Sequence, residues 1–289
     1  MTRLIHLSDL HFGRDRPELL DPLITAVNDL RPDLVAISGD LTQRALDSQF
    51  RAARAFIDRI EAPVLSVPGN HDIPLHLPVT RLLRPFHNYR QWIARDLKPT
   101  AQLDGMTVIG LNTVDRYRWQ RGRIRSRHVR RACSVARDSR PGDLVVLVAH
   151  HPFEHAPGVE KRLMRGADKA IDRLADCGAD VILSGHLHLW RTEPFLTRPF
   201  GANILQIHAG TGLSTRQRGE PNDFACIDRD GEVLRVARWI ASPGDAAFAE
   251  STIRHFGRTP TGWRTLDGQG PIPAGAITAP TAPSQGAFA

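Results

Sequence analysis

Short apolar runs rich in Val, Ile and Leu recur along the chain, and longer amphipathic stretches separate most of them. A short continuous apolar run is typical of a strand that is buried on both faces. Apolar residues at helical spacing instead predict a helix with one buried face, as in the stretch 126–137. We predict strands at 3–7, 34–38, 64–67, 108–111, 144–149 and 181–184, and helices at 17–30, 47–60, 126–137 and 168–177.

This alternation of strands and helices predicts an α/β domain. From Asn203 onward the pattern changes to strands separated by turn residues, at 204–207, 224–227 and 233–240, which predicts a β-rich closing sheet packed on the first. After Arg264 the chain is rich in Gly, Pro, Ala and Thr, and such a composition buries too little apolar surface to order itself. We therefore expect one folded domain over 1–264 and a flexible tail over 265–289.

The composition narrows the class of protein. A content of 41% hydrophobic and 24% charged residues is ordinary for a soluble enzyme, and no apolar run approaches the ~20 residues of a membrane span. The N-terminal segment MTRLIHLSDLHFG lacks the long apolar core of a signal peptide. The cysteines Cys133, Cys177 and Cys226 are odd in number and far apart, which predicts small buried thiols in a reducing compartment. The expected location is cytoplasmic.

The formal net charge is +7, and only three of the 38 basic residues are lysines. A positive field favours anionic partners such as nucleotides, nucleic acid and phospholipid headgroups. The segment 115–131, DRYRWQRGRIRSRHVRR, combines arginines with Tyr117 and Trp119, so nucleic-acid binding is one interpretation of it. The favoured alternative is a loop followed by a solvated helix face.

Polar residues follow five of the predicted strands at the point where each strand ends. In open α/β sheets the carboxyl ends of the strands face one crevice, so we expect these five loops to converge. The blocks are DLH at 9–11, GD at 39–40, GNHD at 69–72, HHP at 150–152 and GHLH at 185–188.

The five blocks would bring carboxylate, amide and imidazole groups together without a thiolate. Such donors select hard to borderline divalent metals such as Mn, Fe, Zn, Ni or Co. Seven donors exceed the four of a structural zinc site and suit two ions about 3.5–4 Å apart. Asp40 directly follows a buried apolar run, and a position between two cations would offset the cost of burying its charge.

In this order, the five blocks resemble the calcineurin-like metallophosphoesterase superfamily over residues 3 to about 190, and AGT at 209–211 is similar to the start of the family's closing sheet. The resemblance implies a four-layer α/β/β/α sandwich of two face-to-face mixed β-sheets flanked by helices. It also implies that the domain at 1–264 is a catalytic domain, in which a metal-bound hydroxide hydrolyses a phosphoester.

The resemblance further implies a binuclear metal centre, with Mn, Fe or Zn as the expected ions. One residue, Asp40, would bind both ions. The remaining ligands would be Asp9, His11 and His188 for one metal, and Asn70, His150 and His186 for the other.

Three more residues receive roles from the resemblance. His71 matches the position near the leaving group, and Asp72 would orient it, so both are candidate catalytic residues. In the HHP block the family pattern favours His150 as the ligand, with His151 supporting it from behind.

Some branches of the superfamily fit poorly. Serine/threonine protein phosphatases carry an acidic-arginine-glycine continuation after GD and a glutamate after GNH, whereas this chain has LTQR at 41–44 and Asp72. Double-strand-break repair nucleases normally continue into a sizeable capping region, for which this chain has little room. Class III cyclic-nucleotide phosphodiesterases and related bacterial phosphodiesterases match best in size and motif order.

The expected function is therefore hydrolysis of a nucleotide-type or other small phosphodiester. The alternatives are a DNA or RNA nuclease, a phospholipid or glycerophosphodiester hydrolase, and a non-catalytic interaction scaffold. A scaffold would show substituted ligands, and none of the seven is substituted. The segment 73–97 follows GNHD and is expected to form a helical flap near the active site that selects the substrate.

Overall fold

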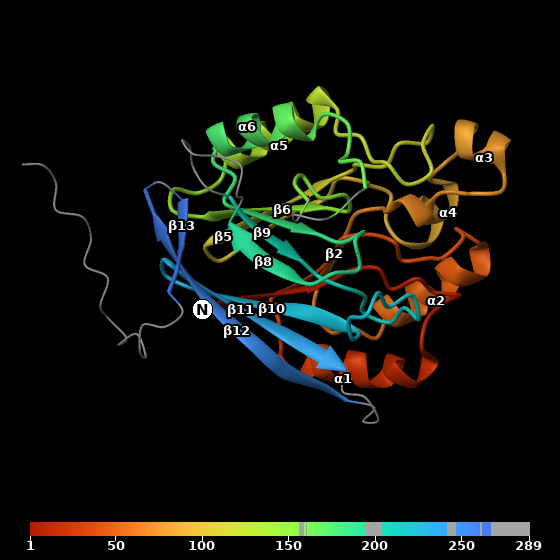
Figure 1. Ribbon diagram of the computed structural model, residues 1–289, viewed down its shortest axis with the longest axis horizontal. Helices are drawn as coiled ribbons and strands as arrows, with labels where there is room; N and C mark the ends of the chain where they lie inside the picture. Colours follow the sequence, from red (N-terminus) through yellow and green to blue (C-terminus); the bar gives the residue numbers. More distant parts are fainter. Residues whose placement is uncertain (156–158, 160, 195–203, 242–246, 261, 267–289) are drawn as a thin grey trace, which may run out of the picture.

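The computed structural model describes residues 1–155, 159, 161–194, 204–241, 247–260 and 262–266. The described chain forms two β-sheets that pack face to face, with helices on both outer faces (Figure 1). This four-layer arrangement of two mixed sheets flanked by helices confirms the expected fold class. Residues 267–289 of the expected flexible tail lie outside the described residues.

The first sheet has seven strands in the order β13-β12-β11-β10-β1-β2-β3. Strand β1 pairs in parallel with β2 and antiparallel with β10, so that Leu4 lies opposite both Leu34 and Ile227. The strands are β1 (Thr2–Leu7), β2 (Leu34–Ile37), β3 (Val64–Ser66), β10 (Asp223–Asp230), β11 (Val233–Ala241), β12 (Phe248–Thr259) and β13 (Gly262–Thr265).

The second sheet has six strands in the order β4-β5-β6-β7-β9-β8. Its inner strands are parallel, and the edge strands β4 and β8 are antiparallel to their neighbours. Along β6 alternate residues face opposite layers: Val146 packs between the sheets and Leu147 packs against the helices. The strands are β4 (Thr100–Leu103), β5 (Met106–Leu111), β6 (Leu144–Ala149), β7 (Val181–Ser184), β8 (Arg191–Pro194) and β9 (Leu205–His208).

The helices bury one apolar face each. Phe50 and Phe56 of α2 pack on the outer face of the first sheet, and Val129 and Leu174 of α5 and α6 pack on that of the second. Burial of such side chains stabilises the fold by about 1.5–3 kcal/mol each. The helices are η1 (Pro17–Leu19), α1 (Leu20–Asp29), α2 (Asp47–Ile57), η2 (Asn70–Asp72), α3 (Pro78–Leu83), α4 (His87–Trp92), α5 (Ser126–Arg137) and α6 (Ala167–Asp176).

The strands after Asn203 do not form the separate closing sheet that we expected. Strand β9 joins the second sheet beside β7, whereas β10 to β13 extend the first sheet from the free edge of β1. The apolar pattern predicted strands here, but it carried no information about the edge with which each strand pairs. Strands β4, β8, β12 and β13 were not predicted, and β12 exposes most of its first half to solvent.

The cysteines also differ from expectation, because two of them are paired. A disulfide joins Cys133 of α5 to Cys177 at the end of α6, with 5.3 Å between the Cα atoms, and only Cys226 is a free buried thiol. Disulfides are rare in reducing compartments, so this pairing does not support the predicted cytoplasmic location. None of the described helices is long and apolar enough to cross a membrane.

Candidate metal centre

The five polar blocks meet at the carboxyl ends of β1, β2 and β3 in the first sheet and of β6 and β7 in the second. Main-chain hydrogen bonds join the loops: Asp9 N donates to Gly39 O (3.1 Å), His11 N to Asp40 O (3.0 Å), and Gly185 N to His150 O (3.2 Å). The main chain therefore brings the loops together independently of any metal.

One glycine permits the closest of these approaches. A Cβ atom at Gly185 would lie 2.2 Å from Asp9 Oδ2 and 1.8 Å from Ser8 Oγ. Without that atom, the loop after β7 can donate the backbone amide of His186 to Asp9 Oδ2 at 2.9 Å. Glycine is therefore required here for close packing of two loops.

Five of the candidate ligands have a left-handed backbone. Their φ angles lie between 51° and 71°, a region that non-glycine residues rarely occupy. Such conformations cost on the order of 1–3 kcal/mol each and persist where the surrounding structure enforces them, often at functional sites. The five residues are Asp9, His11, Asp40, His186 and His188.

Asp9, His11 and His188 form the first group of donor atoms. Asp9 Oδ1 lies 3.2 Å from His188 Nε2 and 3.5 Å from His11 Nε2, yet it is buried and accepts no hydrogen bond. His188 Nδ1 contacts the carbonyl of Arg216 at 2.9 Å. Because a carbonyl only accepts, Nδ1 carries the proton, and His188 Nε2 presents its lone pair to Asp9. An orphaned carboxylate oxygen facing the lone pair of His188 Nε2, with His11 Nε2 beside both, fits a cation at this position.

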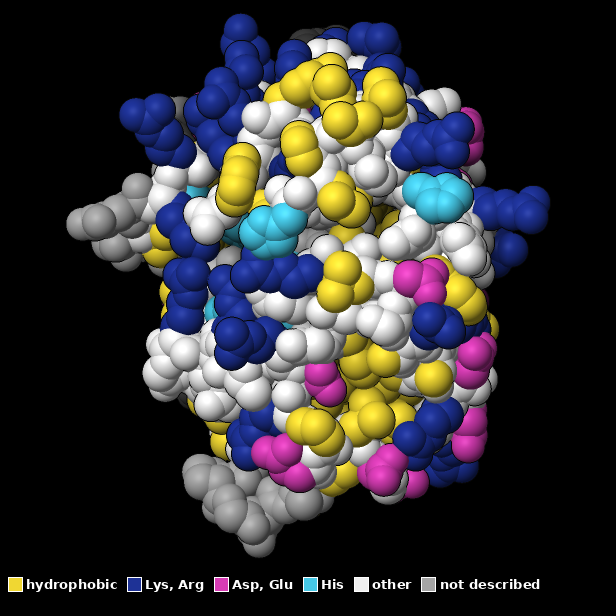
Figure 2. Space-filling view, turned by 90° about the vertical axis from the view of Figure 1, so that its right-hand side faces the viewer, with side chains coloured by type: hydrophobic (Ala, Val, Ile, Leu, Met, Phe, Trp, Pro, Cys, Tyr) yellow, Lys and Arg dark blue, Asp and Glu magenta, His cyan; other side chains and the backbone are white. Residues whose placement is uncertain are grey.

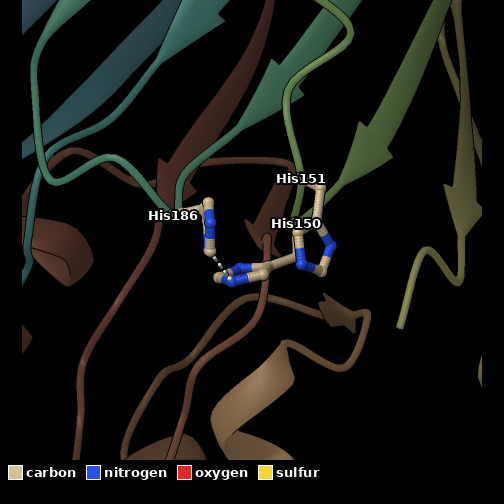
Figure 3. Close-up of side chains that lie close together, drawn as sticks. All are labelled: His150, His151 and His186. Atoms are coloured by element: carbon tan, nitrogen blue, oxygen red, sulfur yellow. Dashed lines mark hydrogen bonds between the residues drawn. The ribbon is translucent and has the colours of Figure 1, made fainter. Parts of the chain in front are cut away.

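Asn70, His150 and His186 form the second group. His150 Nε2 lies 3.1 Å from Asn70 Oδ1 and 3.3 Å from His186 Nδ1, and Figure 3 shows the contact between the two rings. His150 Nδ1 donates to the carbonyl of Ser38 at 3.0 Å. That bond fixes the tautomer in the same way as in His188, so His150 Nε2 faces the group.

Asp40 lies between the two groups. Its Oδ2 atom is 3.3 Å from His150 Nε2 and 3.7 Å from His11 Nε2, while its Oδ1 atom accepts from the backbone amide of His71 at 2.8 Å. The structure therefore brings all seven predicted ligands together, with Asp40 between the two groups.

The electrostatics of the cluster also suit cations. Burial would raise the pKa of Asp9, but His188 and His11 hold it well below its usual range, and His150 and His71 act on Asp40 in the same direction. Burial would lower the pKa of His150, yet Asp40 outweighs it and raises that pKa to about 9. Without metal, a protonated imidazole supplies the positive charge that these buried carboxylates require.

His151 lies beside His150 and His186 (Figure 3), but both of its ring nitrogens contact other groups. Its Nε2 atom donates to the carbonyl of Gln120 at 3.0 Å, and its Nδ1 atom lies 2.8 Å from Thr113 Oγ1. Burial and the adjacent His150 lower the pKa of His151 to about 3, so the ring is neutral. The geometry thus favours His150 over His151 as a ligand.

Asp72 does not orient the His71 ring, contrary to expectation. The His71 ring is held by the carbonyl of Gln43, to which Nδ1 donates at 2.8 Å. The Asp72 carboxylate instead accepts from the backbone amides of Thr42 (2.9 Å) and Gly69 (2.9 Å). Asp72 therefore joins the loops after β2 and β3, and burial and the charge of Asp40 raise its pKa to about 7.

Arg216, in the loop after β9, was missed by the sequence reasoning. Its Nη1 atom donates to His71 Nε2 at 3.1 Å, and its carbonyl accepts from His188. Lys161 lies near enough to Asp9 and Asp40 for their charges to act on it, although burial lowers its pKa. The one sequence signal for Arg216 was its place shortly after AGT at 209–211. Arg216 and Lys161 add positive charge beside the donor groups.

Comparison with known proteins agrees with this geometry. A family model described as calcineurin-like phosphoesterase matches residues 2–189. Similar proteins include a cAMP/cGMP dual specificity phosphodiesterase from Mycobacterium tuberculosis, 27% identical over 68% of this chain and 64% of that protein. The glycerophosphodiester phosphodiesterase GpdQ from Enterobacter lignolyticus is 31% identical over 24% of this chain and 29% of its own length.

A transmembrane protein with a metallophosphoesterase domain from Danio rerio is 26% identical over 72% of this chain and 46% of that protein. The chain thus spans less than two thirds of the length of each of these relatives. Among solved structures, a purple acid phosphatase from yellow lupin seeds superposes with a TM-score of 0.63 at 14% identity, over 87% of this chain and 53% of that one. That likeness concerns the fold.

Proposed function

Because this chain belongs to the calcineurin-like phosphoesterase family, we propose that it is a phosphodiesterase that holds two divalent metal ions and hydrolyses a nucleotide-type or other small phosphodiester. The observation that carries the proposal is the position of Asp40 between two groups of donor atoms. Relatives named as a cyclic-nucleotide phosphodiesterase and a glycerophosphodiester phosphodiesterase support the choice of a diester.

The family binds divalent metals, and the donor set of this chain fits them. Carboxylate, amide and imidazole donors suit Mn, Fe or Zn. When bound, the ions would supply Lewis-acid stabilisation of a phosphoryl oxygen and activation of water. We assign Asp9, His11 and His188 to one ion, Asn70, His150 and His186 to the other, and Asp40 to both.

Arg216 is the candidate for binding the substrate phosphate. Its guanidinium donates a hydrogen bond to His71 Nε2, so that nitrogen carries no proton in this arrangement. His71 can therefore donate from Nε2 to a leaving oxygen only after Arg216 turns away and Nε2 takes up a proton from water. A substrate phosphate would attract the guanidinium and free this nitrogen, because charge-assisted bonds to phosphate are stronger than bonds to neutral imidazole.

A diester needs space on both sides of its phosphorus atom. A cavity of about 630 Å³ extends from Asp72 toward α3 and is lined by apolar side chains that include Pro74, Leu75 and Leu77. In this proposal, the cavity would hold the second ester arm. Its apolar lining also favours a phospholipid, whose acyl chains are apolar, as a second candidate substrate class.

A non-catalytic scaffold is a weaker alternative. A chain that had lost its metal chemistry would have no reason to retain a cluster of buried carboxylates and imidazoles, because unpaired buried charges are costly. Here the orphaned oxygen of Asp9 and the left-handed backbone of five candidate ligands are retained at one site.

The experiment compares bis(p-nitrophenyl) phosphate with p-nitrophenyl phosphate on one Mn-loaded preparation. We expect a clearly higher kcat/KM for the diester. Asp40→Asn, purified in parallel, is the control for a contaminating phosphatase, because its activity should be lost on both substrates. Activity that survives in this variant is not due to the proposed site.

A higher kcat/KM for the monoester would overturn the diester assignment and favour a phosphatase. If the diester is preferred, a second assay distinguishes the substrate classes. It measures hydrolysis of cyclic nucleotides, dinucleotides, glycerophosphodiesters and single-stranded DNA by the same preparation. Cleavage restricted to single-stranded DNA would favour a nuclease.

A further inference from the structure

Helix α3 has the reverse of the usual polarity. Its one charged side chain, Arg81, is 7% exposed, whereas Val79, Leu82 and Leu83 are 68%, 46% and 71% exposed. In a helix on the surface of a soluble protein, the apolar side normally faces the core. Helix α3 instead presents its apolar side chains outward.

Hydrogen bonds hold this inverted orientation in place. The guanidinium of Arg81 donates to the carbonyls of Pro74 (3.1 Å), Arg116 (2.9 Å) and Arg118 (2.5 Å). In return, Arg116 Nη1 donates to the carbonyl of Leu82 at 2.7 Å. Helix α3 and the loop at 115–121 therefore form one unit, and the outward position of the apolar side chains is built into it.

The loop adds two aromatic side chains to this surface. Tyr117 is 61% exposed and Trp119 is 64% exposed. Figure 2 shows apolar side chains gathered in the upper part of this view, with Lys and Arg around them. Within the part of the chain that the structure describes, six of the nine large exposed apolar side chains lie here; we call Leu77, Val79, Leu82, Leu83, Tyr117 and Trp119 the α3 face. Such a concentration marks an interaction surface.

A basic cavity of about 620 Å³ adjoins the α3 face at Leu83. Asp96 is the one carboxylate among its described lining residues, and the N-terminal end of α5 adds the positive end of a helix dipole. The cavity is lined by seven basic side chains: Arg84, Arg90, Arg95, Lys98, Arg116, Arg125 and Arg127.

Among the described residues, these seven basic side chains lack the carboxylate partners that arginines elsewhere in the molecule have. Within the described ranges, none of them forms an ion pair with a carboxylate, whereas Arg3 pairs with Asp228 and Arg258 with Asp180. At the buried floor of the cavity, burial lowers the pKa of His128 to about 4, and the charges of Lys98 and Arg127 contribute to this. Among the described lining residues, the seven basic charges thus exceed the single carboxylate of Asp96.

We propose that the α3 face and the basic cavity together form a docking surface for an anionic lipid bilayer. The aliphatic side chains of α3 would enter the headgroup region, and Tyr117 and Trp119 would lie at its boundary with water. The basic side chains would bind lipid phosphates. The surface contains none of the candidate metal ligands, so this proposal does not depend on the proposed activity.

The combination of basic and exposed apolar side chains favours a bilayer over other partners. A nucleic-acid strand would use the arginines and stack on Tyr117 and Trp119, but it would leave Val79, Leu82 and Leu83 in water. A second copy of the chain would bring seven unpaired positive charges toward another seven, which is unfavourable. A bilayer with anionic headgroups matches both the apolar and the basic parts.

The test is sedimentation of the full chain with vesicles of phosphatidylcholine alone or mixed with phosphatidylglycerol. We expect binding to the mixed vesicles that weakens as salt is raised. Val79→Ser/Leu83→Ser should lower the partition coefficient about tenfold or more. The control is Ile253→Ser, because Ile253 is 40% exposed on β12 and should not contribute.

The double variant Arg90→Gln/Arg95→Gln should also lower vesicle binding about tenfold. Its control is Arg51→Gln/Arg54→Gln. These two arginines of α2 already pair with Asp47 and Asp58, so their loss should not affect binding. Failure to bind mixed vesicles, or equal losses in test and control variants, would overturn the proposal. Binding of single-stranded DNA with no vesicle binding would indicate nucleic acid instead. If the wild-type chain instead self-associates, does not bind vesicles, and loses its self-association in Val79→Ser/Leu83→Ser, the partner is a second copy of the chain.

Discussion

The two carboxylate oxygens of Asp40 have different contacts. Oδ1 accepts a hydrogen bond from the backbone amide of His71, and Oδ2 faces His11 and His150. Asp9 divides its two oxygens in the same way, with Oδ2 bound to the amide of His186 and Oδ1 unpaired. At the scale of single residues, each carboxylate is therefore positioned by the main chain and free to bind a cation.

The first prediction concerns this shared position. Asp40→Asn should lower metal binding at both sites together, by about 100-fold or more, whereas His188→Ala should empty mainly one site. The measurement is the metal content per protein after dialysis, with Asp29→Asn at the exposed end of α1 as the control. Two equivalents of metal retained in Asp40→Asn, with activity intact, would refute the shared position.

The second prediction concerns His71. If it protonates the leaving oxygen, His71→Ala should lose at least about tenfold more rate with a poor alkoxide leaving group than with nitrophenolate, which leaves without help. The rates are measured on two diesters that differ in this group. Equal losses on both substrates would exclude His71 as the acid. Metal content should be unchanged in this variant, which separates a loss of proton transfer from a loss of ligand geometry.

At the scale of elements, helices α5 and α6 are joined by a covalent link as well as by packing. The Cys133–Cys177 disulfide closes a long loop, with a sequence separation of 44 residues. Constraining the unfolded chain in this way stabilises the folded state by about 2–4 kcal/mol. The link lies behind the second sheet, whose strands β6 and β7 carry three candidate ligands at their ends.

The third prediction follows from this link. Cys133→Ser should lower the free energy of unfolding by about 2–4 kcal/mol, measured in urea without reductant. A reductant should destabilise the wild-type chain and have little further effect on the variant. Thiol titration of the denatured chain without reductant should find one reactive thiol, from Cys226. Three reactive thiols would show that the pair is not joined.

At the scale of the whole molecule, two histidines that are not candidate ligands, His6 and His208, are almost completely buried. Burial lowers the pKa of His6 on β1 and the pKa of His208 on β9 to about 3 each. The charge of Arg191 lowers the pKa of His208 further. The charge of Asp9 acts in the opposite direction on both histidines. Their ring nitrogens His6 Nδ1 and His208 Nε2 have no hydrogen-bond partner among the described residues. Both rings are therefore neutral in the folded protein and become protonated when it unfolds in mild acid.

The fourth prediction is a pH dependence with a definite sign. Below about pH 6.5 the unfolded chain binds protons that the folded chain does not, so stability falls as pH falls toward 3, by at most about 1.4 kcal/mol per pH unit for each histidine. Buried Asp223 and Asp72 oppose this in part, because their pKa values in the folded protein are raised to about 6 and about 7. In metal-free protein, His6→Gln/His208→Gln should flatten the dependence between about pH 7 and pH 5. The control is His87→Gln, because His87 is exposed. If His6→Gln/His208→Gln left the slope of stability against pH unchanged, the two buried histidines would not be its source.

The amino-acid pattern predicted an α/β domain and the side chains that would meet, whereas the four layers were implied by the resemblance to the calcineurin-like metallophosphoesterases. Both predictions depend on local pattern: apolar runs mark strands, and a polar block directly after a strand must lie at the carboxyl edge of a sheet. Asp40, His150 and His188 could therefore be grouped without knowledge of any contact between them.

Tertiary structure alone decided the rest, because it depends on contacts between residues that are distant in the chain. No local pattern shows that β10 pairs with β1, that Cys133 meets Cys177, or that Arg216 reaches His71. The orientation of α3 is the clearest case, since the pattern PVTRLL predicts only a short helix. Its apolar side faces outward because carbonyls of the neighbouring loop bind Arg81, and hydrogen bonds to a buried charge outweigh the burial of a few aliphatic side chains.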